Sequence, residues 1–81
     1  MERERVVIYT TDSCGYCRRA KQLLTDRGMG YTEIDVTDDP EQRAWLLEKT
    51  GRRTVPQIFI EDKPIGGYDD LVVLAREGKL T

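Results

Sequence analysis

The chain has 81 residues, a formal net charge of −2 and a sequence pI near 5.1, which predict one small domain over residues 1–81 and give no electrostatic case for nucleic-acid binding. Its longest apolar runs are four or five residues, far too short to span a membrane. Residues 1–5 alternate charges rather than resembling a signal peptide, so we expect a cytoplasmic chain.

The first elements expected are a strand and a helix. The continuous apolar run Val6–Thr10 is typical of a strand buried on both faces. Residues 11–13 are turn and helix-cap formers, and Gly28 is suited to ending a helix. Between them, apolar side chains recur at helical spacing, at Cys17, Ala20, Leu23 and Leu24.

A second strand and a second helix follow. Residues 31–36 alternate between an apolar and a polar face, which favours a strand at a sheet edge. Asp39 and Pro40 form a strong helix start, and Gly51 ends that helix. We expect its inward face to carry Ala44, Trp45 and Leu47, and whether Leu46 also belongs to it is left open by the pattern.

The last third of the chain predicts a hairpin and a helix. Residues 57–60 form an apolar strand, residues 61–63 a tight turn, and residues 63–66 a second strand, which Pro64 assigns to a sheet edge. The final helix follows residues 68–70 and ends near Gly78, with apolar residues at Leu71, Val72, Leu74 and Ala75. Trp45, Leu23, Leu24 and Phe59 are assigned to the core.

This order predicts an α/β fold. A right-handed crossover makes the first two strands parallel, whereas the hairpin is antiparallel. The compact solution is a four-stranded mixed β-sheet flanked by three α-helices.

The two cysteines of the chain, Cys14 and Cys17, lie three positions apart where the first strand gives way to a helix. A helix N-terminus carries free N–H groups and partial positive charge, which stabilise a thiolate at Cys14, and Cys17 is near enough to form a disulfide with it. A pair of buried apolar side chains is the alternative, but it does not explain Cys14. Because the sequence has no histidine, a zinc site would have only two soft ligands per chain.

The chain resembles the glutaredoxins, small dithiol members of the thioredoxin superfamily. The resemblance covers nearly the whole chain and is carried by residues 9–17 (YTTDSCGYC), 54–59 (TVPQIF) and 65–71 (IGGYDDL). Gly15 and Thr11 replace a proline and a lysine that are common in the family, and Tyr68 stands at an often small position and is expected to narrow the groove.

The resemblance implies a thioredoxin-like fold and a glutathione-dependent thiol–disulfide oxidoreductase that reduces protein disulfides and glutathione mixed disulfides. Cys14 would be the nucleophile and Cys17 the resolving thiol. The peptide bond between Val55 and Pro56 would be cis, so that Val55 pairs with the backbone of the substrate. The implied glutathione-binding residues are Tyr16, Arg43, Thr54, Val55, Pro56, Gly67, Tyr68, Asp69 and Asp70.

Partners and alternatives follow from the same resemblance. Glutathione would be the co-substrate, and the protein partners would be disulfide-containing or glutathionylated proteins. The chain itself would act as a monomer. Some glutaredoxins instead hold a bridging 2Fe–2S cluster between two protomers, with the first cysteine of each and two glutathiones as ligands, so an iron–sulfur carrier is the alternative function. No metal site within the single chain is expected.

Overall fold

Seven elements follow one another in the computed structural model, which describes residues 5–79. In chain order they are β1 (Val6–Thr10), α1 (Gly15–Asp26), β2 (Thr32–Asp35), α2 (Pro40–Thr50), β3 (Gln57–Ile60), β4 (Lys63–Gly66) and α3 (Tyr68–Arg76). The predicted order of strands and helices is confirmed. The strand expected over residues 31–36 is shorter by one residue at each end.

The four strands form one mixed sheet in the order β2-β1-β3-β4. β1 pairs in parallel with β2 and antiparallel with β3, and β3 pairs antiparallel with β4. The polar face of β2 and Pro64 in β4 therefore both lie on edge strands, as predicted, because neither tolerates burial between two neighbours. Glu61 and Asp62 make the two-residue hairpin turn with φ values of 52° and 68°.

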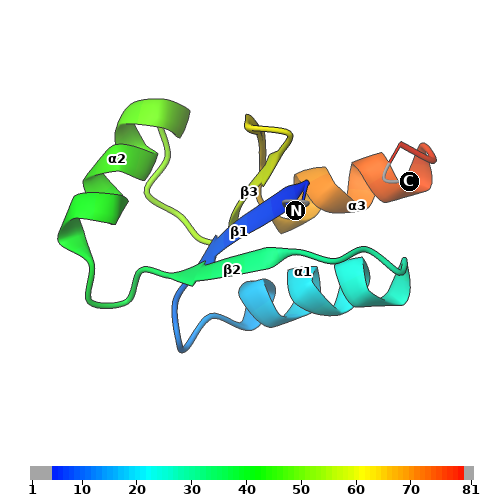
Figure 1. The fold of residues 1–81 in the computed structure, drawn as a ribbon, viewed down its shortest axis with the longest axis horizontal. Helices are drawn as coiled ribbons and strands as arrows, with labels where there is room; N and C mark the ends of the chain where they lie inside the picture. The colour runs from blue at the N-terminus through cyan, green and yellow to red at the C-terminus, as the bar shows by residue number, and fades with distance from the viewer. Residues whose placement is uncertain (1–4, 80–81) are drawn as a thin grey trace, which may run out of the picture.

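One face of the sheet is covered by α1 and α3. Ile8 and Ile58 point from the two central strands into a cluster with Leu24 of α1 and Leu71 of α3, and all four are fully buried. Figure 1 shows these two helices together, away from α2. This apolar layer fixes where both helices begin, and both N-termini lie at the site described below.

The other face is covered by α2, and here two expectations are wrong, because Ala44 and Trp45 were both expected on the inward face and both are exposed. Leu46 is the buried residue of α2, packing with Tyr9, Val36 and Phe59. Trp45 was expected in the core, yet 37% of it is exposed, and its ring stacks on Phe59 at 5.7 Å between centroids. Adjacent helix positions point about 100° apart, so α2 can turn only one of the two side chains into the sheet.

The helix ends agree with the predicted caps. The Asp39 carboxylate accepts the N–H of Gln42 at 3.1 Å and so caps α2, with Pro40 as its first residue. Gly28 and Gly51 follow α1 and α2 with φ values of 71° and 73°, where a side chain would be strained.

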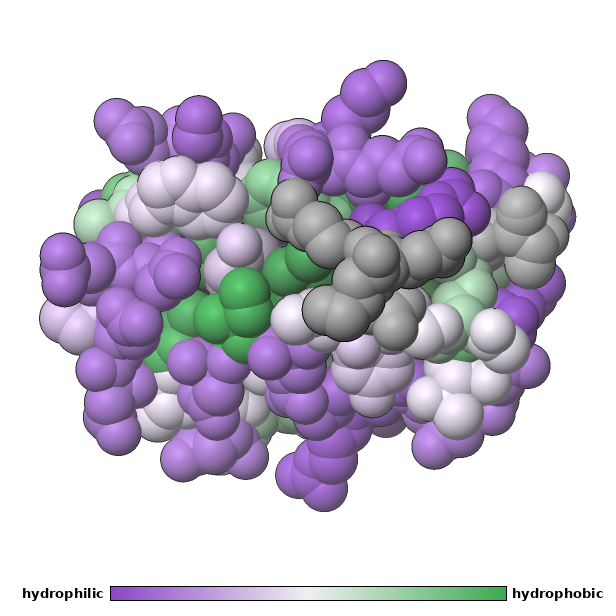
Figure 2. Space-filling view, viewed as in Figure 1, coloured by the Kyte–Doolittle hydropathy of each residue, from purple (hydrophilic) through white to green (hydrophobic). Residues whose placement is uncertain are grey.

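The surface is mostly polar. Figure 2 shows hydrophilic side chains over most of one face, with an apolar strip near its middle. Within residues 5–79, no helix has both the length and the apolarity that a membrane crossing requires.

Candidate functional site

The Cys14 sulfur sits at the N-terminus of α1. Cys14 is the N-cap residue in an extended conformation, and its Sγ accepts the backbone N–H of Cys17 at 3.0 Å. The first turn of α1 contains no acidic residue, so its partial positive charge is not neutralised locally. Both cysteines are free thiols; Cys14 is half-buried, whereas Cys17 is 1% exposed. One sulfur can therefore meet a substrate and the other lies directly beneath it.

The environment of Cys17 keeps this residue protonated. Burial raises the pKa of the Cys17 thiol, and a hydrogen bond with Cys14 raises it further. The backbone N–H of Thr11 and the ammonium of Lys21 act in the opposite direction and lower that pKa. The two cysteines thus differ in exposure, and the buried one is held as a thiol, which suits an attacking and a resolving cysteine in thiol–disulfide exchange.

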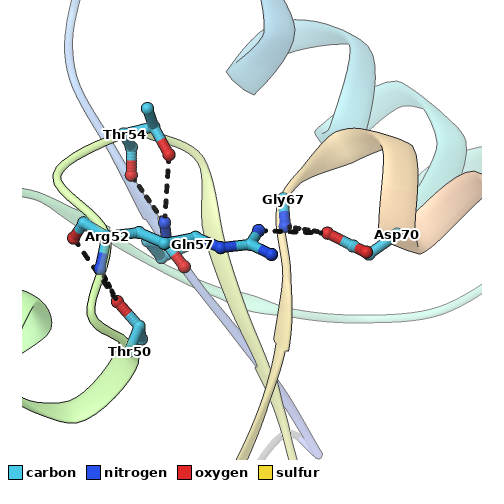
Figure 3. Close-up of polar contacts among 6 residues, drawn as sticks. All are labelled: Thr50, Arg52, Thr54, Gln57, Gly67 and Asp70. Atoms are coloured by element: carbon cyan, nitrogen blue, oxygen red, sulfur yellow. Dashed lines mark hydrogen bonds and ion pairs between the residues drawn. The ribbon is translucent and has the colours of Figure 1, made fainter.

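A loop before β3 brings a backbone edge to the Cys14 sulfur. The Val55–Pro56 peptide bond is cis, as predicted, and the Cys14 thiol donates to the Val55 carbonyl at 3.6 Å. Gln57 holds this loop from below, because its side-chain amide donates to the carbonyl of Thr54 at 2.8 Å and to the Thr54 hydroxyl at 3.3 Å (Figure 3). From the sequence, Gln57 was expected only as a strand residue.

The N-terminus of α3 forms the far side of the site. Gly67 is its N-cap residue, and its N–H donates to Asp70 Oδ2 at 2.9 Å. The same oxygen accepts Arg52 Nη1 at 3.3 Å, so that Arg52 reaches across to α3 from the loop after α2 (Figure 3). Part of the positive end of α3 is therefore neutralised by its own acid, while Asp69 is exposed to solvent.

These elements enclose one pocket of about 240 Å³. It collects eight of the nine residues predicted to bind glutathione, together with Arg52; the lining residues are Tyr16, Arg52, Thr54, Val55, Pro56, Gly67, Tyr68, Asp69 and Asp70. Val55 joins the pocket to the Cys14 sulfur through the contact described above. A ligand attached to that sulfur would therefore extend toward the N-terminus of α3.

Arg43 is the predicted residue that the structure places elsewhere. Its Nε donates to the carbonyl of Val36 at 2.9 Å, and it lines a second cavity of about 610 Å³ with Arg53 and apolar residues of α2. Arg52, Thr54 and Val55 line both cavities, so the two adjoin along the loop before β3. Arg43 lines the second cavity and is not among the residues that line the first.

Aromatic side chains form one wall of the pocket. The rings of Tyr16 and Tyr68 lie 5.9 Å apart between centroids, and the Arg19 guanidinium lies 5.4 Å over the Tyr16 ring. Tyr16 is 57% exposed although large and aromatic. An exposed aromatic wall beside a reactive sulfur offers a flat apolar surface to a bound ligand.

Two side chains near the cysteines, those of Arg52 and Lys21, make contacts that were not predicted from the sequence. The contact of Arg52 with Asp70 spans 18 positions, which no local pattern reveals. Lys21 lies four positions after Cys17 and so on the same helix face. That spacing was the available signal.

Within residues 5–79, no group of three or more His, Cys, Asp or Glu side chains is placed to hold a metal ion. The clustered groups of the site are instead thiols, backbone N–H groups, carboxylates and one arginine, which suit sulfur exchange and the binding of a charged organic ligand.

Comparisons with known proteins point to one family. The glutaredoxin family model matches residues 6–65. Over 75 residues the chain is 55% identical to a glutaredoxin of Pseudomonas aeruginosa, covering 93% of this chain and 89% of the relative. It is 44% identical over 75 residues to glutaredoxin 3 of Escherichia coli, covering 93% of this chain and 90% of the relative.

Solved structures agree with the sequence relatives. The buckwheat glutaredoxin–glutathione complex superposes with a TM-score of 0.89 at 39% identity, covering 95% of this chain and 73% of the other. The solution structure of a glutaredoxin from Brucella melitensis gives a TM-score of 0.84 at 51% identity, covering 95% and 84%. The fold is therefore thioredoxin-like, and the chain belongs to the glutaredoxin family of thiol–disulfide oxidoreductases.

Proposed function

We propose that this chain uses glutathione to reduce glutathione mixed disulfides and protein disulfides, with Cys14 as the nucleophile and Cys17 as the resolving thiol. The observation that carries the proposal is a short path through Val55, whose carbonyl accepts the Cys14 thiol at 3.6 Å and which also lines the pocket at the N-terminus of α3. Glutathione has a thiol at its centre and a zwitterionic amino-acid end, and the path offers a partner for each.

The zwitterionic end fits the start of α3. The backbone N–H groups of the first helical turn lack partners within the helix and form an anion site for the γ-glutamyl carboxylate. Asp70 already accepts Gly67 and Arg52, whereas the exposed Asp69 has no recorded side-chain partner among the described residues. We therefore assign the ammonium of glutathione to Asp69 and a supporting role to Asp70.

The middle of the ligand fits the loop before β3. The backbone of Val55 would pair with the cysteine backbone of glutathione like one rung of a β-sheet, while Thr54 and Pro56 complete the edge. Tyr16 and Tyr68 would cover the ligand from the side. Arg52 borders the pocket and, with Arg43 and Arg53 beyond the loop, gives this region a positive charge that suits a tripeptide of net negative charge.

The reaction follows from the difference between the two sulfurs. The Cys14 thiolate attacks a glutathionylated protein, the protein thiolate leaves, and glutathione remains on Cys14 as a mixed disulfide. A second glutathione thiolate then attacks this disulfide, which releases glutathione disulfide and regenerates Cys14. With a protein disulfide, Cys17 attacks the intermediate instead, and the two cysteines end as a disulfide that two glutathione molecules reduce.

Two lines of evidence support glutathione as the ligand. One structural relative, the buckwheat glutaredoxin at 39% identity, was crystallised as a glutathione complex. The chain's own pocket supplies the donors and carboxylate described above. The partners that we propose are glutathione and disulfide-containing or glutathionylated proteins, with the chain acting as a cytoplasmic monomer. No observation favours the iron–sulfur carrier, which we do not propose.

The test is glutathione-dependent reduction of a glutathionylated peptide by the wild type, Cys14→Ser and Cys17→Ser. We expect Cys14→Ser to be inactive and Cys17→Ser to keep most of the activity, because the monothiol route needs only the exposed sulfur. A wild type that is inactive with glutathione but active with thioredoxin reductase would contradict the proposal.

A further inference from the structure

A cluster of three polar side chains lies at the edge of the sheet, and one of them, Lys21, is one helical turn from the resolving cysteine. The hydroxyl of Thr10, a residue that is 1% exposed, donates to Glu33 Oε2 at 2.7 Å. The same oxygen accepts Lys21 Nζ at 3.0 Å. Lys21 lies one helical turn after Cys17 on the same face of α1, and its ammonium acts electrostatically on the Cys17 sulfur.

Within this cluster, Glu33 and Lys21 stabilise each other's charged forms. The pKa of Glu33 is lowered, first by the Thr10 hydroxyl and then by Lys21. The pKa of Lys21 is raised, chiefly by its hydrogen bond to Glu33, so Lys21 is a cation at neutral pH. Only 27% of the Lys21 side chain is exposed, so solvent screens this charge less than that of a free surface lysine.

The influence of Lys21 depends on the chemical state of Cys14. In the reduced protein, a hydrogen bond with Cys14 and its charge add to burial in raising the pKa of Cys17. Once Cys14 is joined to a substrate as a mixed disulfide, its sulfur carries no charge, so both of these effects are lost. Burial then still raises the pKa of Cys17, while the Thr11 N–H and the Lys21 ammonium still lower it.

We propose that Lys21, held in place by Glu33 and Thr10, is a positioning residue that stabilises the Cys17 thiolate in the resolving step. This inference rests on the dithiol mechanism of the proposed function. In that step Cys17 loses its proton and attacks the Cys14 sulfur. The bond between Cys14 and the substrate breaks, and the leaving thiolate takes up a proton while the Cys14–Cys17 disulfide forms.

The substitution Lys21→Met removes the charge and keeps most of the side-chain length. For each unit by which the pKa of Cys17 rises, the thiolate fraction falls tenfold while the nucleophilicity of the thiolate increases. With the usual dependence of nucleophilicity on pKa, the resolving rate falls by about three- to fourfold per unit. The attack by Cys14 on the substrate precedes this step and is not affected in the same way.

Stopped-flow reaction of the reduced protein with dipyridyl disulfide separates the two steps without glutathione and without a charged probe. Attack by Cys14 releases one thiopyridone, and attack by Cys17 on the resulting mixed disulfide releases the second, so the probe is reduced by two electrons and the dithiol is oxidised. The variant Cys17→Ser identifies the phases, because it gives only the first release.

We expect Lys21→Met to slow the second release by about threefold or more and to shift its pH profile upward, with the first release unchanged. Lys21→Arg should restore the second release. Lys49→Met is the matched control, because it removes the charge of an exposed lysine on α2. The groups facing this path that could contribute to the profile are Cys14, Lys21, Tyr31, Glu33 and Asp35.

A second release that matches the wild type at every pH would overturn the inference. Equal slowing of both phases, or failure of Lys21→Arg to restore the second phase, would overturn it in favour of a purely structural role. Because the assay contains no glutathione, these outcomes do not depend on whether glutathione is the natural reductant, which the glutathionylated-peptide assay decides separately.

Discussion

The N-termini of α1 and α3 lie at the same site but use their free N–H groups differently. At α1 the N-cap is the sulfur of Cys14, which accepts an N–H at 3.0 Å, and no acid occupies the first turn. At α3 the first turn holds Asp69 and Asp70, and Asp70 accepts the N–H of Gly67 at 2.9 Å.

Under the proposed function, this difference assigns reaction to the start of α1 and ligand binding to the start of α3. A helix N-terminus without acids leaves its positive end for a developing thiolate, which is needed at Cys14. A helix N-terminus with two acids holds one carboxylate for its own cap and presents the other beside the remaining N–H groups, which suits a zwitterion. In this proposal a helix N-terminus stabilises a thiolate at α1 and binds a zwitterion at α3, and the residues of the first turn decide which.

The largest expected effect comes from crowding the start of α3. In Gly66→Ala the new Cβ would meet the Asp70 carboxylate at a φ of 116°, which only glycine adopts readily. We expect a loss of about 2–3 kcal/mol in the free energy of unfolding, measured by urea denaturation. Gly15→Ala is the control, because open space surrounds that position. Equal stability of the two variants would contradict the close approach of Asp70 to position 66 on which this prediction rests.

The two acids of α3 should separate in function. Asp69→Asn should raise the KM for glutathione about fivefold, because an exposed charge-assisted hydrogen bond to the ammonium is worth about 1 kcal/mol. Asp70→Asn should lower the free energy of unfolding by less than about 1 kcal/mol and have the smaller effect on KM, because its contacts are with Gly67 and the half-exposed Arg52. A larger KM change in Asp70→Asn would reverse our assignment.

Giving α1 an acid should make it resemble α3. Gly15→Glu places a carboxylate in the first turn, where no atom would lie within 4 Å of the new Cβ. In a Cys17→Ser background, we expect alkylation of Cys14 by iodoacetamide to slow by about two- to fivefold, because the acid competes with the thiolate for the helix charge. Gly15→Gln keeps the size without the charge and should react like the parent; if it slows equally, the effect is steric.

The smallest effect should come from Gly15→Pro. Gly15 is the first residue of α1, and Cys14 before it is extended with φ of −102° and ψ of 111°, a conformation that a following proline accepts. We expect the free energy of unfolding to rise by about 0.5 kcal/mol through restriction of the unfolded chain, measured by urea denaturation. A destabilised variant would show that the N–H of Gly15 has a role.

The sequence predicted those parts of the fold and site that depend on local patterns. The strand Val6–Thr10, the caps at Asp39 and Gly51 and the position of Cys14 at a helix start all follow from residue type and spacing. The cis bond before Pro56 was predicted through the family resemblance, since an isolated X-Pro pair does not specify it.

The rest depended on tertiary packing. Whether α2 buries Trp45 or Leu46 depends on how the helix lies on the sheet. The pattern of apolar and polar residues in α2 does not determine that orientation. The contact of Arg52 with Asp70 and that of Lys21 with Glu33 join segments whose separation along the chain conceals them. Such contacts become visible only after the strands have been paired.

The central claim is that one glutathione is held by both helix N-termini, by its sulfur at α1 and by its zwitterionic end at α3. The most direct measurement is the change in backbone amide NMR shifts when glutathione is attached to Cys14 in Cys17→Ser. We predict large shifts at Tyr68 and Asp69 as well as beside Cys14. Shifts confined to the residues around Cys14, with those of α3 unchanged, would contradict the account.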